Sequence, residues 1–220
     1  MQLCHIKIYT SIAEPPQTRY NTPMQQINDI KDFADMHSVP IMKDEGISFI
    51  CDYIKEHNVK RVLEIGTAIG FSSINFARAG EEVFVSTIEM DLERYQAAVK
   101  NIADNGLSDR ITCYLGDAGT WTAPQGEVYD LIFIDGPKAQ YISHFERFKE
   151  WLSPGGVIIT DNLSFHGMVD DLSLTHNYST KKLVKKIQKY AEYLRTNEEF
   201  ETTFYEVGDR IAVSRRISSS

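Results

Sequence analysis

The stretch RVLEIGTAIGFSS, residues 61–73, passes from a short apolar run through a glycine-bearing turn into a helix-like pattern. Residues 61–65 read as a β-strand, and residues 71–79 read as a helix that follows it directly. Gly66 and Gly70 would let the backbone turn sharply and approach a ligand closely. A strand, a tight turn and a helix in this order predict the first unit of an α/β sheet.

The residues on either side of this unit extend the pattern. Further strands are expected at 82–88, 111–115, 129–134 and 157–160, and helices at 25–37, 45–57, 92–105 and 140–151. The run YDLIFI at 129–134 is apolar almost throughout, as in a strand that is buried on both faces of a parallel sheet. The residues Ser153-Pro-Gly-Gly156 read as a turn that leads into the strand at 157–160.

The last part of the sequence has a different pattern. An amphipathic helix is expected at 181–195, followed by strands at 200–206 and 211–214 that Gly208-Asp209 joins. This pair of residues is a hairpin signal, so the two strands should be antiparallel. The sequence therefore predicts an α/β fold with a Rossmann-like, mostly parallel sheet of seven strands that ends in an antiparallel hairpin. Residues 25–220 read as one domain, preceded by an arm at 1–24 that its prolines keep irregular.

Composition excludes several classes of protein. The 220 residues are 42% hydrophobic, which is ample for a core, and no run of 18 apolar residues predicts a membrane span. The first residues lack the pattern of a signal peptide, and three widely spaced cysteines do not suggest a disulfide framework, so we expect a cytoplasmic protein. The net charge of −8 disfavours a binder of phosphate backbones, although it says nothing about local patches.

Polar residues stand where the first three strands end. Glu64 and Gly66 follow the first strand, Glu89 ends the second, and Asp117 and Ala118 follow the third. In a doubly wound sheet, ligands bind beyond the carboxyl ends of the strands, where a carboxylate can accept hydrogen bonds from ribose hydroxyls. A dinucleotide fingerprint would need glycine at positions 68 and 71, where this sequence has alanine and phenylalanine. The pattern therefore favours S-adenosylmethionine over a nicotinamide cofactor, although each position alone also fits a plain turn or a solvated strand end.

Two neighbouring strand ends carry oxygen ligands. Asp135 follows the strand at 129–134, and Asp161 and Asn162 follow the strand at 157–160. Carboxylate and amide oxygens without cysteine or histidine favour Mg²⁺, Mn²⁺ or Ca²⁺ over zinc. Asp161 and Asn162 alone would more often cap a turn. With Asp135 beside them, a metal site is the better interpretation, because a cation would offset the repulsion between the two carboxylates.

These motifs resemble those of a known family. VLEIGTAIGFSS, IE at 88–89, GDA at 116–118, FIDGPKAQY and LSPGGVIITDN look like the metal- and S-adenosylmethionine-dependent O-methyltransferases of the catechol and caffeoyl-CoA type. The likeness runs from about residue 39 to residue 214. Within that family, HSVPIMKDEG, LSFHGMV and VGDRIAVSRR look most similar to bacterial tRNA 5-hydroxyuridine methyltransferases, which make 5-methoxyuridine at the wobble position.

The resemblance implies a role for particular residues. It implies that Asp135, Asp161 and Asn162 are the metal ligands and that Lys138, with Asp135, is catalytic, the lysine acting as general base. Positions around the cofactor are then Met42, Glu64, Gly66, Ser72, Glu89, Asp117, Ala118 and Asp135. One departure is the pair Gly136-Pro137 between Asp135 and Lys138, where the family has other residues. Proline stiffens this turn and could change the direction of the lysine.

Three functions remain open at this stage. The first is methylation of 5-hydroxyuridine in tRNA, for which the lysine-rich helix at 181–195 offers a cationic contact, although such faces are often simply solvated. The second is methylation of a small catechol or a caffeoyl-CoA-like molecule. The third is a non-catalytic cofactor-binding domain. The resemblance also implies a homodimer.

Overall fold

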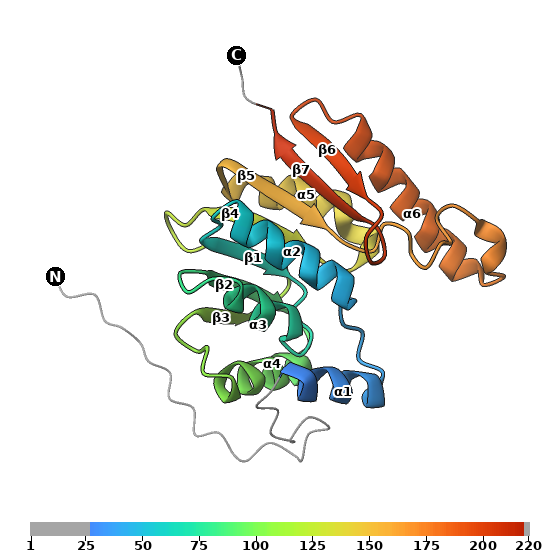
Figure 1. Ribbon diagram of the computed structural model, residues 1–220. Helices are drawn as coiled ribbons and strands as arrows, with labels where there is room; N and C mark the ends of the chain where they lie inside the picture. The colour runs from blue at the N-terminus through green and yellow to red at the C-terminus, as the bar shows by residue number, and fades with distance from the viewer. Residues whose placement is uncertain (1–26, 218–220) are drawn as a thin grey trace.

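A single seven-stranded sheet organises the chain, in a computed structural model that describes residues 27–217. The strand order is β3-β2-β1-β4-β5-β7-β6 (Figure 1). The five strands β1 to β5 pair in parallel, and β7 is antiparallel to both β5 and β6. The predicted mostly parallel sheet with an antiparallel hairpin is confirmed. The predicted arm at 1–24 lies outside the described residues.

The elements alternate along the chain as the sequence patterns predict. The strands are β1 (Arg61–Ile65), β2 (Phe84–Glu89), β3 (Ile111–Leu115), β4 (Tyr129–Ile134), β5 (Leu152–Thr160), β6 (Phe200–Tyr205) and β7 (Ile211–Arg216). The helices are α1 (Ile27–His37), α2 (Asp44–Glu56), α3 (Phe71–Arg78), α4 (Leu92–Asp104), α5 (Tyr141–Phe148) and α6 (Tyr178–Arg195). Short 3₁₀ turns η1 (Lys138–Gln140), η2 (Lys149–Trp151) and η3 (Leu172–Leu174) complete the chain.

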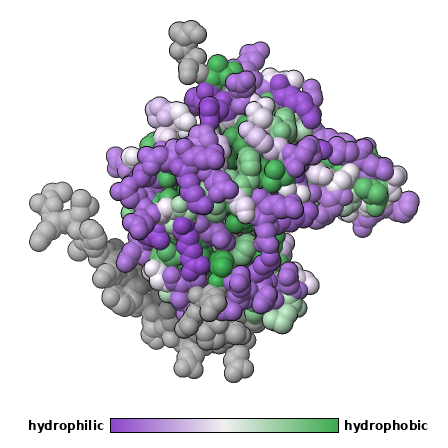
Figure 2. Space-filling view, viewed as in Figure 1, coloured by the Kyte–Doolittle hydropathy of each residue, from purple (hydrophilic) through white to green (hydrophobic). Residues whose placement is uncertain are grey.

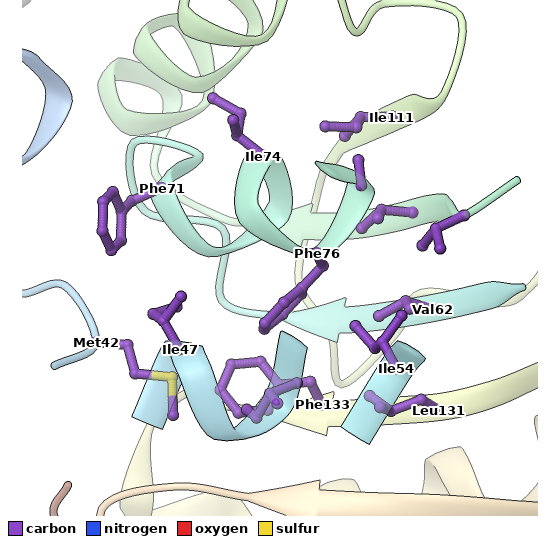
Figure 3. Packing of buried hydrophobic residues seen from close by; sticks show 14 of the residues in the cluster. Met42, Ile47, Ile54, Val62, Phe71, Ile74, Phe76, Ile111, Leu131 and Phe133 are labelled. Carbon is purple, nitrogen blue, oxygen red and sulfur yellow. The ribbon is translucent and has the colours of Figure 1, made fainter. Parts of the chain in front are cut away.

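Helices cover both faces of the sheet, and each face has its own core. Helices α1 to α4 pack on one face, where Phe76 of α3 meets Phe133 of β4 edge to face at 5.4 Å between ring centroids (Figure 3). Helices α5 and α6 cover the other face and bury large side chains such as Phe145 and Tyr190. Strand β4 is buried along nearly its whole length, because it contributes to both cores.

Two elements begin three or more residues before their predicted start, and the other predicted bounds differ less at their start. Residues 153–156 are part of β5 rather than a turn before it, and the register against β4 shifts between Tyr129 and Leu131 to absorb them. Helix α6 begins at Tyr178, three residues before the predicted start, because the Asn177 side chain caps it by accepting a hydrogen bond from the Thr180 N–H at 3.1 Å. Neither difference moves the carboxyl ends of the strands.

The segment between β5 and α6 projects from the body of the molecule (orange in Figure 1). Its surface mixes hydrophilic and hydrophobic residues (Figure 2). Leu174 in this segment is 61% exposed, and Tyr178, the first residue of α6, is 72% exposed. Helix α6, which follows this segment, contacts η1 at the carboxyl edge of the sheet. Among residues 27–217, no helix combines the length and apolar character that a membrane span needs.

Candidate active site

A cavity of about 610 Å³ lies at the carboxyl edge of the sheet. All but two of the predicted site residues line it, namely Met42, Gly66, Glu89, Asp117, Ala118, Asp135, Lys138, Asp161 and Asn162. They come from the ends of five different strands and from the loop before α2. The topology thus brings together side chains that are spread from residue 42 to residue 162 of the sequence.

The turn after β1 forms the floor of the cavity. Gly66 has a φ of +104°, and a Cβ built on it would lie 2.4 Å from the backbone oxygen of Asp135. Only glycine fits both constraints, since side chains rarely adopt this φ and no space exists for one. The close approach of the β1 and β4 loops depends on this glycine, and the Asp135 N–H donates to the Ile65 oxygen at 3.0 Å beside it.

Glu64 and Ser72 do not reach the cavity. Glu64 is fully buried and accepts hydrogen bonds from the hydroxyls of Ser72, Ser73 and Thr87. Burial raises the pKa of Glu64, and the three hydroxyl donors oppose that rise. The structure therefore places these two predicted cofactor residues behind the β1 turn, where they hold the first turn of α3 against β1 and β2.

Glu89 and Asp117 lie along the cavity at the ends of β2 and β3. The Glu89 carboxylate is 6% exposed and accepts hydrogen bonds from the N–H groups of Ala68 and Asp91, both at 2.9 Å. Two fixed donors hold this carboxylate in place while its remaining lone pairs stay available for ligand hydroxyls. Asp117 is exposed and caps its own loop through the Gly119 N–H at 2.7 Å.

Asp135, Asp161 and Asn162 converge at the other end of the cavity. The Asn162 amide donates to Asp135 Oδ1 at 3.0 Å and to Asp161 Oδ2 at 3.1 Å. Asp161 is 3% exposed, and its buried Oδ1 has no hydrogen-bond partner within residues 27–217. Burial, followed by the repulsion of Asp135, raises the pKa of Asp161. Burial likewise raises the pKa of Asp135, and the Lys138 ammonium opposes that rise.

This donor set fits a hard divalent cation. A buried carboxylate oxygen without a partner is costly, and a cation beside it would remove both that cost and the repulsion between the two carboxylates. Within residues 27–217, no group of three or more His, Cys, Asp or Glu side chains is placed to hold a metal ion. A cation here would therefore depend on two carboxylates, the Asn162 amide and oxygens from outside the protein.

Lys138 lies in η1, directly after Pro137. Its Nζ is 5.8 Å from the centroid of the Phe165 ring, and the side chain lines the cavity. Pro137, with φ −60° and ψ 111°, ends the β4 loop and starts the 3₁₀ turn. The unusual Gly136-Pro137 pair therefore still brings the lysine to the same cavity as both aspartates.

Sequence reasoning missed Asp209 and His144. Asp209 lines the cavity from the β6–β7 turn, is 6% exposed, and also raises the pKa of Asp161. The Gly208-Asp209 signal predicts a hairpin, but no local pattern shows that the turn returns to the end of β5. His144 of α5 is 2% exposed and lines the cavity, and neither ring nitrogen has a hydrogen-bond partner in the described part of the chain. Burial lowers its pKa.

Tyr141 and the basic face of α6 also lie near this edge. The Tyr141 hydroxyl is buried and donates to the backbone oxygen of Asp161 at 3.1 Å, so this ring supports the β5 end rather than facing a ligand. The apolar face of the amphipathic helix α6 packs inward, with Val184, Ile187 and Leu194 buried and Leu183 half-buried. In the part of the chain that the structure describes, none of the five α6 lysines (181, 182, 185, 186 and 189) forms an ion pair with a carboxylate.

Comparisons with known proteins, by sequence and by structure, find similarity to O-methyltransferases. The family model described as O-methyltransferase matches residues 20–217. A catechol O-methyltransferase of Mycobacterium tuberculosis is 32% identical over 134 residues, which are 60% of this chain and 60% of that protein. A Staphylococcus aureus structure, provisionally assigned as a caffeoyl-CoA O-methyltransferase, has 34% identity and a TM-score of 0.82 over 87% of this chain and 92% of its own.

A third similarity concerns the fold alone. An O-methyltransferase from Bacillus cereus, solved in complex with S-adenosylhomocysteine, has 22% identity and a TM-score of 0.73 over 87% of this chain and 90% of its own. The match to the M. tuberculosis protein spans about three fifths of that relative's length, and the structural matches extend over nearly the whole described chain.

Proposed function

The chain belongs to the O-methyltransferase family, and we propose that it transfers the methyl group of S-adenosylmethionine to a hydroxyl oxygen of a metal-chelating acceptor. The observation that carries this proposal is the composition of one cavity. Its glycine turn and the Glu89 and Asp117 strand ends suit an adenosine cofactor, while two carboxylates and an amide lie at its other end.

Each residue near the cofactor has a proposed part. Glu89 accepts hydrogen bonds from the ribose hydroxyls, and Asp117 with Ala118 contacts the adenine. The Gly66 turn allows the cofactor to approach the backbone, and Met42 covers it from the loop before α2. Asp135 lies at the boundary between the cofactor and the acceptor. Glu64 and Ser72 act indirectly, because their hydrogen bond fixes the helix that follows the turn.

Asp135, Asp161 and Asn162 would hold a divalent cation, with Mg²⁺ as the first choice and Mn²⁺ or Ca²⁺ as alternatives. Such an ion, when bound, supplies charge that lowers the pKa of a chelated hydroxyl. Tyr141 supports the ligands, since it donates to the Asp161 backbone. Loss of metal-dependent transfer in Asp161→Ala, with folding retained, is the expected result. If Asp161→Ala in chelator-treated buffer methylates as fast as the parent protein in buffer with Mg²⁺, no metal takes part.

Lys138 Nζ accepts the proton of the acceptor hydroxyl in the proposed reaction. The lysine lines the same cavity as Asp135, and the oxygen that it deprotonates attacks the sulfonium methyl group in line. The remaining contribution of the protein is alignment of the two reactants. Lys138→Met should therefore lower kcat far more than it changes the affinity for S-adenosylhomocysteine, which calorimetry measures.

The acceptor that we favour is 5-hydroxyuridine at the wobble position of tRNA, which becomes 5-methoxyuridine. Its 5-hydroxyl and 4-carbonyl form a chelating oxygen pair similar to that of a catechol. Helix α6 supports this proposal, because its lysines lack carboxylate partners among the described residues and the helix contacts η1, which contains Lys138. This acceptor implies a cytoplasmic enzyme of tRNA processing.

A small catechol or a caffeoyl-CoA-like molecule is the second candidate, because the M. tuberculosis relative is a catechol O-methyltransferase. Transfer of radiolabelled methyl groups separates the two. We expect label in tRNA from cells that lack this gene and little label in catechol. Label confined to catechol would contradict the tRNA proposal, and absence of S-adenosylhomocysteine binding would instead favour a non-catalytic domain.

We also propose a homodimer, as the family resemblance implies, with the N-terminal helices as contacts. Analytical ultracentrifugation at micromolar concentration should then give about twice the 25.1 kDa mass of one chain. A monomer at that concentration would contradict this assembly without affecting the proposed chemistry.

A further inference from the structure

Asp209 and His166 join two loops that are 43 residues apart in sequence, at the metal-ligand end of the cavity. Both residues line the cavity. The backbone N–H of His166 donates to Asp209 Oδ1 at 2.8 Å, and the backbone N–H of Ser164 donates to the Asp209 backbone oxygen at 2.8 Å. Asp209 therefore holds the loop that follows Asn162 by two separate bonds.

The second carboxylate oxygen of Asp209 has no hydrogen-bond partner among the described residues. This Oδ2 is buried, and the His166 ring approaches it with Nδ1 at 3.9 Å. That distance is too long for a hydrogen bond, but rotation of an imidazole that is 63% exposed can close it. An unpaired buried carboxylate oxygen favours such a rotation, since leaving it unpaired costs free energy.

The backbone around His166 adopts a conformation that costs free energy. Phe165 and His166 have φ values of +47° and +56°, a left-handed conformation that residues with a side chain rarely adopt. Arg210 secures the same loop from outside through two bonds to the Asp170 carboxylate, at 3.1 and 2.9 Å. Strain that surrounding contacts maintain beside a cavity is typical of functional positions.

We propose that His166, positioned by Asp209, recognises the acceptor by accepting a hydrogen bond from a ring N–H next to its chelating carbonyl. The inference rests on the proposed methyl transfer to a chelated hydroxyl. When Asp209 accepts the Nδ1–H of a neutral imidazole, Nε2 carries a lone pair and can only accept a hydrogen bond. The pair then selects an acceptor that offers a donor at that edge.

This requirement separates the two candidate acceptors chemically. In 5-hydroxyuracil the N3–H is adjacent to the 4-carbonyl, on the same edge as the chelating oxygens. A catechol has a C–H at the corresponding ring position and leaves Nε2 without a partner. The His166–Asp209 pair therefore favours a hydroxylated uracil over a catechol, because an unpaired polar group in a binding site is costly.

The test compares kinetics of the intact protein with an anticodon stem-loop RNA that contains 5-hydroxyuridine and with catechol. For His166→Phe, we expect the KM for the RNA to rise about fivefold to tenfold, with a much smaller change in kcat. His166→Gln, which retains an acceptor oxygen, should recover part of this loss. His57→Phe replaces an exposed histidine of the α2 end and should leave both KM values as in the parent protein.

A double-mutant cycle tests the coupling between the two residues. Asp209→Asn should raise the KM for the RNA in the same way as His166→Phe, and the double variant should be no worse than either single variant. The ratio of kcat/KM for RNA to that for catechol should fall in all three. Additive effects, an unchanged ratio, or equal losses on both acceptors would overturn the proposal.

Calorimetry with S-adenosylhomocysteine separates this proposal from the one on which it rests. Unchanged cofactor affinity in His166→Phe is expected, because the pair lies at the metal-ligand end. If the parent protein binds the cofactor and methylates only catechol, recognition of a uracil edge is wrong while the methyltransferase proposal stands. If the parent protein neither binds the cofactor nor methylates either acceptor, the proposed function itself fails.

Discussion

Gly66 shows how one residue joins the turn after β1 to the Asp135 end of the cavity. Its positive φ and the backbone oxygen of Asp135 exclude any side chain there. Gly66→Ala should destabilise the protein by about 2–4 kcal/mol and weaken S-adenosylhomocysteine binding, because the β1 and β4 loops must separate. Thermal unfolding and calorimetry measure the two effects.

Gly126 provides a matched control for Gly66→Ala. It also has a positive φ, +83°, but a Cβ built on it would meet no atom of residues 27–217 within 4 Å. Gly126→Ala should therefore cost only about 1 kcal/mol and leave cofactor binding unchanged. Similar losses in both variants would mean that backbone conformation alone, and not the contact with Asp135, accounts for the role of Gly66.

His144 makes a residue-scale prediction about pH. Its buried ring has a lowered pKa in the folded protein, so the unfolded chain takes up its proton first as pH falls. The free energy of unfolding of the parent protein therefore decreases as the pH falls below 6.5, the ordinary pKa of this group. His144→Leu removes that loss, so its stability relative to the parent protein should increase as pH falls from about 8 to about 5.5. Urea unfolding without cofactor, at several pH values, measures the difference, and a constant difference would contradict the buried neutral ring.

The two described cysteines are expected to be unreactive. Burial raises the pKa of Cys51 to about 11 and that of Cys113 to about 12. At about pH 8 the thiolate fraction is then about one part in a thousand or less, and thiolate is the reactive form. Peptide mapping after iodoacetamide treatment of the folded protein should leave both residues unmodified. Rapid labelling of either one would show that its pocket opens.

At the scale of elements, the C-terminal hairpin secures the segment that follows β5. Arg210 of the β6–β7 turn forms two bonds to Asp170, and its backbone oxygen accepts from the Leu163 N–H at 3.1 Å. Arg210→Ala should speed proteolytic cleavage within residues 163–177 several-fold, while the melting temperature falls only slightly. Arg78→Ala, which removes a surface bond from α3 to Asn105, is the control, and cleavage that is equally fast in both would contradict the anchoring.

Local sequence patterns predicted most of the helices and strands, because the spacing of apolar residues within a segment depends on the secondary structure of that segment. The apolar run at 129–134 indicated a strand buried on both faces, and the place of Asp135 at its end followed from the sheet direction. The sequence did not predict that Asp209 and His144 line the cavity, because packing between distant elements, rather than any local spacing, brings them there. Glu64 shows the opposite case, since a motif position that looks like a ligand contact is buried behind the turn. A motif does not reveal which face of the strand meets the cavity.

At the scale of the whole molecule, the charge distribution bears on the tRNA proposal. The net charge of −8 coexists with a helix whose lysines have no carboxylate partners among the described residues. Replacing Lys182, Lys185 and Lys189 with glutamine should weaken RNA binding and reduce its salt dependence, by about one unit of slope for each phosphate that a lysine no longer neutralises. Filter binding at several salt concentrations measures both.

A charge-matched control distinguishes a local interaction from a general effect of charge. Glutamine at positions 31, 55 and 60 removes the same number of positive charges from side chains that already pair with carboxylates. RNA affinity should change little in that variant, and catechol methylation should be the same in both. If the two triple variants lose RNA affinity equally, helix α6 is not the contact surface.

The position of β7 has a consequence for how the protein is made. In the sheet this strand separates β5 from β6, although the ribosome completes it after both. Until β7 emerges, the edge of β5 is unpaired and β6 has no neighbour to dock against, and exposed strand edges are sites of aggregation. The turn that brings Asp209 to the cavity lies directly before β7, so the half-made chain is vulnerable to misassembly and also lacks part of the lining of the cavity. Pairing of β7 between β5 and β6 therefore closes the exposed strand edges and completes the cavity lining in the same late step.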